Sequence, residues 1–136
     1  MRALIVDDEL EVRTALAACV GLVGCDGIDT AMSGAEALKM ALLNRYDLIT
    51  VDLQMPGVGG LDILETLRTT CPQGVIAVIS GHVDKLTNSA AQIADVAIEK
   101  PFNTEHIKKL AKHAKFIAEN RAAIQKLGNM GGAPQI

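Results

Sequence analysis

Aromatic residues are nearly missing from this sequence of 136 residues, which has one tyrosine, two phenylalanines and no tryptophan. Proteins that bind single-stranded nucleic acid by base stacking need several aromatic side chains, so the composition disfavours that class. The core must instead be built from aliphatic side chains. Since 49% of the residues are hydrophobic, there is enough apolar material for one domain of this length.

Cysteine and long apolar runs are also scarce. The three cysteines, at positions 19, 25 and 71, form no C-x-x-C pair, which disfavours a disulfide framework or a structural zinc site. The first residues, MRALIVDDE, lack the apolar region of a signal peptide, and no uncharged stretch reaches the about 20 residues of a membrane-spanning helix. We therefore expect reduced thiols, a cytoplasmic protein and no membrane insertion.

Charge is unevenly distributed along the chain. Residues 1–100 contain 14 acidic and 7 basic residues, whereas residues 101–136 contain 2 acidic and 6 basic ones. The basic segment has two interpretations, namely a solvated helix face or a docking surface for an acidic partner.

Short apolar runs alternate with helical patterns along the chain. The runs predict strands at 3–6, 28–31, 48–51, 75–80 and 96–99, and the helical patterns cover about 10–23, 33–44, 61–70, 85–94 and 104–127. Ser33 and Glu36 have the spacing of a capping box at the start of the second helix. The alternation predicts an α/β fold: a doubly wound, five-stranded parallel sheet of order 2-1-3-4-5, flavodoxin-like, flanked by five helices.

Polar residues stand where these strands end. The first strand is followed by Asp7 and Asp8 and the third by Asp52, while the fourth ends on Ser80 and the fifth is followed by Lys100. In a parallel sheet these ends share one edge, where ligands bind. Two unit charges about 4 Å apart repel by about 4 kcal/mol at an effective dielectric constant near 20, so clustered carboxylates require cations.

The chemistry of this cluster is that of phosphoryl transfer. Lys100 supplies one positive charge, and an all-oxygen ligand set favours Mg²⁺ or Mn²⁺ over zinc. Aspartate side chains act as nucleophiles that form aspartyl phosphates, and the transferred group needs positioning and charge neutralisation.

Four motifs give the chain a family resemblance: VDDE (6–9), VDLQMPGVGGLD (51–62), ISG (79–81) and KPF (100–102). Over roughly residues 1–118 the chain resembles the receiver domains of bacterial two-component response regulators, the CheY-like family. The resemblance implies that Asp52 accepts a phosphoryl group from a sensor histidine kinase or a phosphotransfer protein. It also implies that the Ser80 hydroxyl and Lys100 bind the phosphoryl oxygens, and that the Lys100–Pro101 bond is cis.

The resemblance further implies a metal site and residues that tune it. Asp8, Asp52 and the backbone carbonyl of Gln54 would ligate Mg²⁺ directly, and Asp7 through water. The side chains of Gln54 and His82 occupy positions that tune loss of the phosphoryl group, although His82 has the alternative interpretation of an exposed loop residue. We expect His106 and His113 to face solvent.

The chain departs from the family pattern at Ala97. Receivers usually carry an aromatic ring three residues before the lysine, and that ring changes rotamer when the hydroxyl moves. Because Ala97 has no ring, we hypothesise a shallow pocket beside it that a partner side chain occupies; movement of the 80–84 loop alone is the alternative.

The predicted last helix is longer than the sheet requires. About 24 residues span roughly 36 Å, whereas a five-residue strand spans about 17 Å. We expect a receiver domain over 1–118, an extension of the last helix over 119–128 and a flexible tail over 129–136. The extension frays, pairs with a second protomer in a homodimer or leads to an output domain; pairing is favoured because Ile124 and Leu127 would otherwise face water.

The leading interpretation is a stand-alone phosphorylation switch rather than an enzyme acting on other substrates. We expect a downstream protein target and no direct nucleic-acid contact, since residues beyond 118 contain no DNA-binding segment. A phosphatase of the haloacid dehalogenase type is one rival, but that family needs a second aspartate two residues after its nucleophile, and Glu9 and Gln54 stand there. A receiver that serves as a scaffold without phosphoryl transfer is another.

Overall fold

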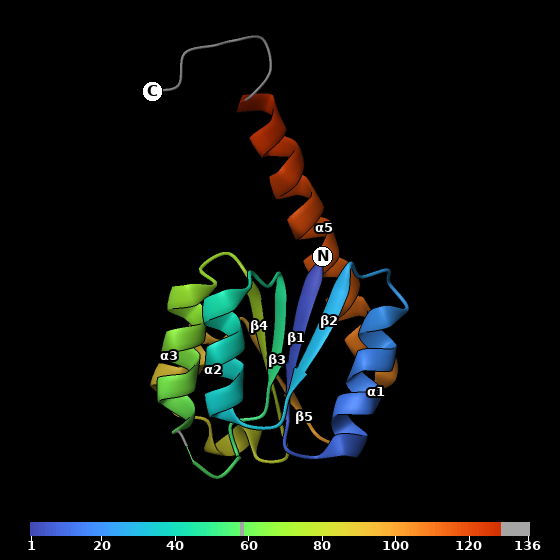
Figure 1. Ribbon diagram of the computed structural model, residues 1–136. Helices are drawn as coiled ribbons and strands as arrows, with labels where there is room; N and C mark the ends of the chain where they lie inside the picture. Colours follow the sequence, from blue (N-terminus) through green and yellow to red (C-terminus); the bar gives the residue numbers. More distant parts are fainter. Residues whose placement is uncertain (58, 129–136) are drawn as a thin grey trace.

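The computed structural model describes residues 1–57 and 59–128 and is drawn in Figure 1. Strands and helices alternate along the chain, as the sequence predicts. Their bounds are β1 Arg2–Val6, α1 Leu10–Gly21, β2 Gly27–Ala31, α2 Gly34–Leu43, β3 Leu48–Val51, α3 Gly60–Thr70, β4 Val75–Ser80, the 3₁₀ turn η1 Val83–Lys85, α4 Asn88–Ile93, β5 Val96–Glu99 and α5 Thr104–Gly128.

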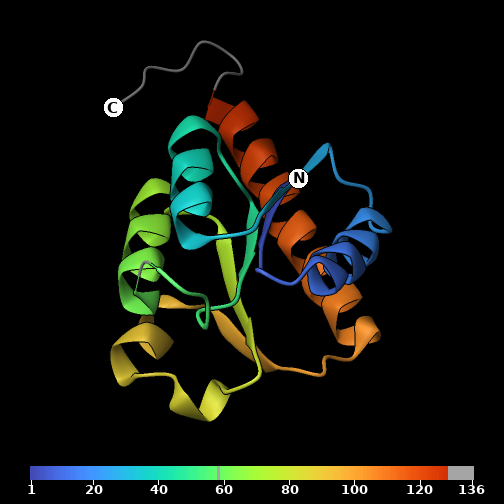
Figure 2. The ribbon, with the colours of Figure 1, turned by 60° about the horizontal axis from the view of Figure 1, so that its bottom comes forward.

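The sheet is entirely parallel and has the predicted order β2-β1-β3-β4-β5. Helices α1 and α5 cover one face, and α2, α3 and α4 cover the other, as Figures 1 and 2 show. Each face has its own aliphatic core, and the central strand β3 is buried along its whole length. This arrangement brings the carboxyl ends of β1 and β3 next to each other at the point where the strand order reverses.

Helix α2 begins as its sequence predicts. The Ser33 hydroxyl accepts a hydrogen bond from the Glu36 backbone N–H at 3.2 Å. The Glu36 carboxylate accepts from the backbone N–H of Met32, at 3.4 Å, rather than from that of Ser33. The capping-box spacing therefore located the helix start, but the return bond reaches one residue further back.

The single helix predicted over 85–94 is wrong. This segment contains the turn η1 and the six-residue helix α4, and the Thr87 hydroxyl between them accepts a hydrogen bond from the Ala90 N–H at 3.2 Å. A threonine that caps a new helix start ends continuity with the preceding turn. The short α4 leaves the edge strand β5 largely exposed, including Ala97.

Smaller differences concern helix ends. Helix α1 ends at Gly21, two residues before its predicted end, and is followed by Gly24 with a φ of +80°. A positive φ at that position is easily adopted by glycine and interrupts helical geometry. The other predicted strand and helix ends agree within one or two residues.

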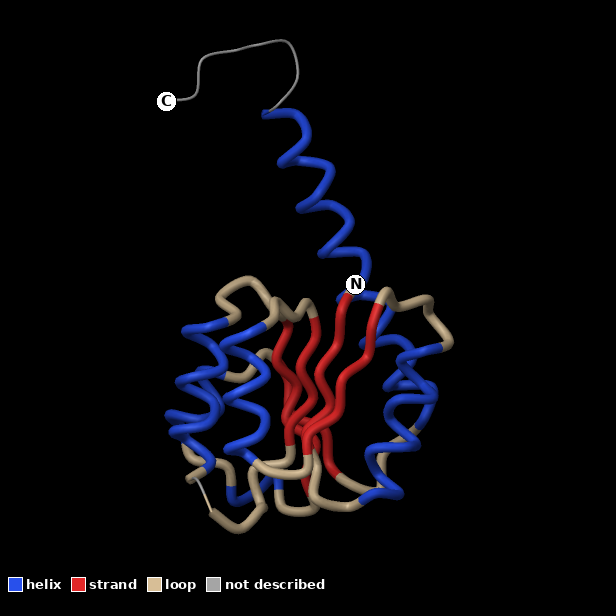
Figure 3. Tube along the Cα trace, in the orientation of Figure 1, coloured by secondary structure: helices blue, strands red, loops and turns tan. Residues whose placement is uncertain are grey.

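Helix α5 continues well past the sheet, as Figures 1 and 3 show. Its first half is anchored by the buried residues Ile107, Ala111 and Ala114, whereas every residue from 119 to 128 is exposed. His106 and His113 are exposed, as expected. The predicted flexible tail, 129–136, lies outside the described residues. In the described part of the chain, no helix is both long enough and apolar enough to cross a bilayer.

Candidate functional site

Asp52 directly follows β3 and is only 5% exposed. Its backbone N–H donates to the Val6 carbonyl at 3.0 Å, so the β1–β3 ladder extends to this residue. One carboxylate oxygen, Oδ1, accepts from the Gln54 backbone N–H at 2.8 Å. The strand can therefore end on a buried carboxylate because the loop that follows provides a hydrogen-bond donor for it.

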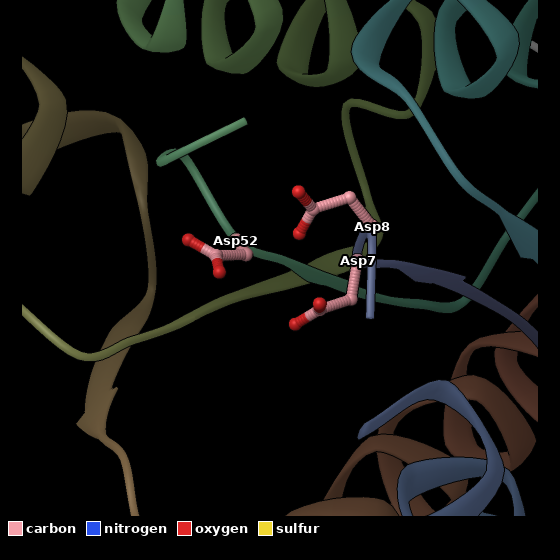
Figure 4. A group of neighbouring side chains, drawn as sticks. All are labelled: Asp7, Asp8 and Asp52. Carbon is pink, nitrogen blue, oxygen red and sulfur yellow. The ribbon is translucent and has the colours of Figure 1, made fainter. Parts of the chain in front are cut away.

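Asp7 and Asp8 follow β1 at the same edge. Asp7 is buried, and its Oδ1 accepts from the Glu9 backbone N–H at 2.9 Å. Asp8 is exposed, and no hydrogen bond or ion pair to its carboxylate is found among the described residues. Figure 4 shows the two side chains extending toward Asp52, and one oxygen from each of the three carboxylates lies within 4.8 Å of the others.

Lys100 connects two of these carboxylates. Its Nζ lies 2.8 Å from Asp7 Oδ2 and 2.9 Å from Asp52 Oδ2, with Glu9 Oε1 at 3.6 Å. Burial of the ammonium group acts to lower its pKa, but the hydrogen bonds and negative charges of Asp7 and Asp52 outweigh burial and raise the pKa of Lys100 above its ordinary value. Lys100 is therefore a fixed positive charge at this site, and its bond to Pro101 is cis, as expected.

Ser80 stands at the end of β4 beside these groups. It is buried, its carbonyl accepts from the Lys100 backbone N–H at 2.9 Å, and its hydroxyl accepts from the His82 backbone N–H at 3.4 Å. Ser80, Gln54 and His82 line one cavity of about 220 Å³ between the start of α3 and the η1–α4 segment. The predicted tuning residues thus lie at the same edge as the carboxylates, and His82 is exposed.

Ala97 is not among the residues that line this cavity. It pairs with Val78, which does line it, and its own side chain is exposed on β5. The pocket hypothesised beside Ala97 therefore remains a prediction, and the hollow found here lies one strand away, under α3 and α4.

Arg13 is a residue of this site that sequence reasoning missed. It is buried on α1, and its Nη1 donates to the Asp7 backbone carbonyl at 2.7 Å. A signal was present, because Arg13, Leu16 and Val20 have the spacing of one helix face, and the other two are buried apolar residues. A basic residue on an apolar face, six positions after an acidic strand end, is an indication of a buried charge partner.

The donor set fits a divalent cation of the magnesium type. Three carboxylates converge, their oxygens are hard ligands, and no cysteine or histidine joins the group found among the described residues. Lys100 offsets part of the negative charge, and within the described part of the chain the Asp8 oxygens accept from no protein donor. Asp7 and Asp52 each accept one backbone N–H and the Lys100 ammonium, so Asp8 has the most oxygen lone pairs left for a cation.

This geometry agrees with a known protein family. The sequence model of the response regulator receiver domain family matches residues 3–112 of this chain. The chain belongs to this family. Its members are phosphoacceptor switches in two-component signalling.

Several relatives and solved structures support the assignment. The chain is 35% identical over 103 residues to the transcriptional regulatory protein PrrA of Mycobacterium tuberculosis. The aligned residues are 74% of this chain and 44% of PrrA. The chain is also 33% identical over 110 residues to the response regulator MprA of Mycobacterium avium. The aligned residues are 79% of this chain and 47% of MprA. The chain thus spans less than half the length of these relatives.

Among solved structures, the response regulator TrrA of Thermotoga maritima in complex with Mg²⁺-BeF is similar, with a TM-score of 0.74, 32% identity and coverage of 83% of this chain and 97% of TrrA. A response regulator of Burkholderia pseudomallei with a phosphorylated aspartic acid has a TM-score of 0.71 and 29% identity, and covers 90% of this chain and 71% of that one. The receiver fold and a divalent-metal site are therefore supported by both sequence and structure.

Proposed function

We propose that Asp52 of this receiver domain is the phosphoacceptor and that its phosphorylation switches the protein contacts of the chain. The observation that carries this proposal is the joint contact of Lys100 with Asp7 and Asp52, at 2.8 and 2.9 Å. A buried carboxylate beside a fixed cation and a serine hydroxyl has the surroundings that a transferred phosphoryl group needs.

In the proposed reaction, a carboxylate oxygen of Asp52 attacks the phosphorus of a phosphohistidine. A phosphorus–oxygen bond forms, the phosphorus–nitrogen bond breaks, and the released imidazole takes up a proton. Lys100 pairs with one phosphoryl oxygen and the Ser80 hydroxyl donates to another. The switch then repacks the surface near β5, because the new charge attracts these two groups.

The metal would be held by Asp8, Asp52 and the Gln54 backbone carbonyl directly, and by Asp7 through water. When bound, Mg²⁺ supplies charge neutralisation of the phosphoryl oxygens, and Mn²⁺ suits the same ligands. The exposed carboxylate of Asp8, which accepts from no donor among the described residues, supports its proposed role as a direct ligand.

Gln54 and His82 are proposed to set the lifetime of the aspartyl phosphate, since both line the cavity beside Ser80. Ala97 is proposed to leave space for a side chain of the downstream partner. The exposure of Ala97 on β5 supports this idea, and Ala97→Tyr would then change partner binding.

The proposed partners are a sensor histidine kinase or phosphotransfer protein, a downstream protein target and a second copy of the chain at the last helix. We propose residues 1–118 as the receiver domain and 119–128 as a helical extension. The chain is proposed to act in the cytoplasm, without direct nucleic-acid contact and without enzymatic turnover of other substrates.

Incubation with acetyl phosphate, followed by intact mass, tests the proposal. We expect the mass increase of one phosphoryl group with Mg²⁺ and none in EDTA, because the carboxylate cluster needs a cation to bind another anion. Asp52→Asn abolishes the increase, whereas the matched control Asp62→Asn, an exposed aspartate of α3, keeps it. Absence of any adduct contradicts the proposal and favours a scaffold receiver; sustained release of phosphate from a generic phosphate ester favours the phosphatase.

A further inference from the structure

The outer half of α5 has two sides with different surroundings. Ala118, Arg121, Ala122 and Gln125 line a hollow against the loop that joins α3 to β4. The Arg121 guanidinium donates to the Gln73 carbonyl in that loop. This side of the helix is therefore in contact with the body of the domain.

The opposite side of the outer half is apolar and uncovered. Phe116, Ile124 and Leu127 are 63%, 66% and 66% exposed, and Ile117 is 39% exposed. At 3.6 residues per turn, these residues and Ala123 share one helix side, interrupted only by Asn120. Figures 1 and 3 show the C-terminal part of α5 extending beyond the sheet. We call this side, residues 116, 117, 120, 123, 124 and 127, the outer stripe.

We propose that a second copy of this chain covers the outer stripe, with the two α5 helices antiparallel. When one of two α5 helices is reversed about the midpoint of the outer stripe, the residues of the two stripes come level with one another in pairs. Phe116 then lies level with Leu127 of the second copy and Asn120 with Ala123, while Ile117 lies beside Ile124 on one flank. Each of these pairs occurs twice by the twofold symmetry, as an isologous contact requires.

The charges beside the stripe match in the same arrangement. Glu119 and Lys126 are exposed on the other flank of the stripe, and reversal brings each next to its opposite in the second copy. Glu119 also lies 3.9 Å from Lys115 of its own chain, so Lys126 of the second copy would join an existing ion pair. In a parallel pair, residues of equal number are level, so Glu119 and Lys126 lie opposite no charge of the other sign at this spacing. Flanking charges of this kind determine helix orientation in paired helices.

A hollow on the body of the domain lies where the end of α5 of the second copy would dock. Leu22, just after α1, is 72% exposed and is one of three apolar residues, with Val23 and Phe116, that line a hollow. The other residues that line it are charged, namely Lys112, Lys115 and Glu119. In the antiparallel arrangement, Leu127 of the second copy meets Phe116 at this place. It would cover Leu22 as well, which extends the apolar contact from the helix onto the body.

This surface lies at the opposite edge of the sheet from Asp52, since α5 leaves the domain where β1 begins (Figure 1). The inference therefore does not depend on phosphoryl transfer. Labelling of Asp52 by acetyl phosphate, measured on each variant below, reports failure of the proposed function separately from failure of the dimer.

Sedimentation velocity with single charge reversals tests the proposal. The unmodified chain is expected to form a dimer. Glu119→Lys and Lys126→Glu each place like charges opposite one another twice per dimer, and should each weaken dimerisation at least about tenfold, which is about 1.4 kcal/mol. Mixed in equal amounts, the two variants should form a heterodimer. Both like-charge contacts of each homodimer are then replaced, because one chain has lysine at 119 and 126 and the other has glutamate at both positions. Gln125→Lys, on the side that faces the body, should leave the dimer intact.

Ile124→Asp adds an independent measurement, since it removes apolar contact at the stripe and should yield monomers with an unchanged circular dichroism spectrum. A chain that sediments as a monomer at every concentration overturns the proposal and assigns the stripe to a different protein. A dimer that withstands both reversals, or a mixture that stays monomeric, overturns the antiparallel arrangement.

Discussion

At the scale of single residues, the site depends on how buried charges are compensated. Lys100 contacts two carboxylates, and Arg13 donates to the backbone of one of them. The two cations act differently, because Lys100 neutralises side chains whereas Arg13 holds the turn after β1 in place. Arg13 is thus a positioning residue for Asp7 and Asp8 rather than a group that would touch the phosphoryl.

Replacement of Arg13 by methionine should destabilise the domain and weaken Mg²⁺ binding together. The Asp7 carbonyl would lose its donor in a buried position, which costs about 1.5–3 kcal/mol for a hydrogen bond to a charged group. Urea unfolding measures the stability and titration calorimetry the Mg²⁺ affinity. Arg45→Met, at an exposed arginine, is the matched control and should change neither. Unaltered Mg²⁺ affinity in Arg13→Met would mean that Arg13 has no positioning role.

The single tyrosine offers a test by pH titration. Burial of Tyr46, and then its 2.7 Å hydrogen bond to Asp29, raise the pKa of its hydroxyl to about 12 from an ordinary value of 10.0. Because the folded state holds the proton more tightly, this contribution to stability is fully present below about pH 10 and is lost between about pH 10 and 12.

Absorbance of tyrosinate gives the midpoint directly, since the sequence has no tryptophan. The native protein should titrate near 12 and the urea-unfolded protein near 10. Asp29→Asn should shift the native midpoint downward, because a charged acceptor is lost. A native midpoint at the unfolded value would contradict the packing described for this residue.

At the scale of elements, helix starts decide which surfaces are covered. The cap at Ser33 starts α2 over the core, while the cap at Thr87 starts a helix too short to cover β5. The exposed β5 is the surface through which the proposed switch would be read. Because α4 is short and Ala97 has no ring, the surface of β5 next to Ser80 is left uncovered.

Ser33→Ala should lower the free energy of unfolding by about 1 kcal/mol, since the first turn of α2 loses the acceptor for the Glu36 N–H. Chemical denaturation measures this loss. Ser89→Ala is the control, because Ser89 is exposed inside α4 and caps no helix. Equal stability of both variants would show that the cap contributes nothing.

At the scale of the whole molecule, sequence periodicity predicted most of the fold because most strands are short, apolar and bounded by polar residues. The bounds 48–51 and 75–80 were correct to the residue, since each run ends at or next to a residue that serves the site. The η1–α4 segment was wrong because one hydroxyl, that of Thr87, caps a helix start within the predicted helix. Arg13 was missed because a charge on a helix normally indicates solvent, although its spacing from Leu16 and Val20 places it on the buried face of α1.

The two proposed activities, phosphoryl transfer and self-association, thus lie at opposite edges of the sheet. The carboxyl edge of the sheet carries Asp7, Asp8, Asp52, Ser80 and Lys100, and the opposite edge carries the projecting α5 with its outer stripe. Separate edges allow phosphorylation and self-association to be varied independently by mutation. That separation is what makes each proposal testable without loss of the other.

Chemical trapping of the phosphorylated residue tests the central claim most directly. Borohydride reduces an aspartyl phosphate to homoserine, so peptide sequencing by mass spectrometry after treatment with acetyl phosphate and Mg²⁺ identifies the acceptor. We expect homoserine at position 52 and at no other aspartate. Homoserine at Asp7 or Asp8, or no conversion at Asp52 in a protein that gains a phosphoryl group, would contradict it.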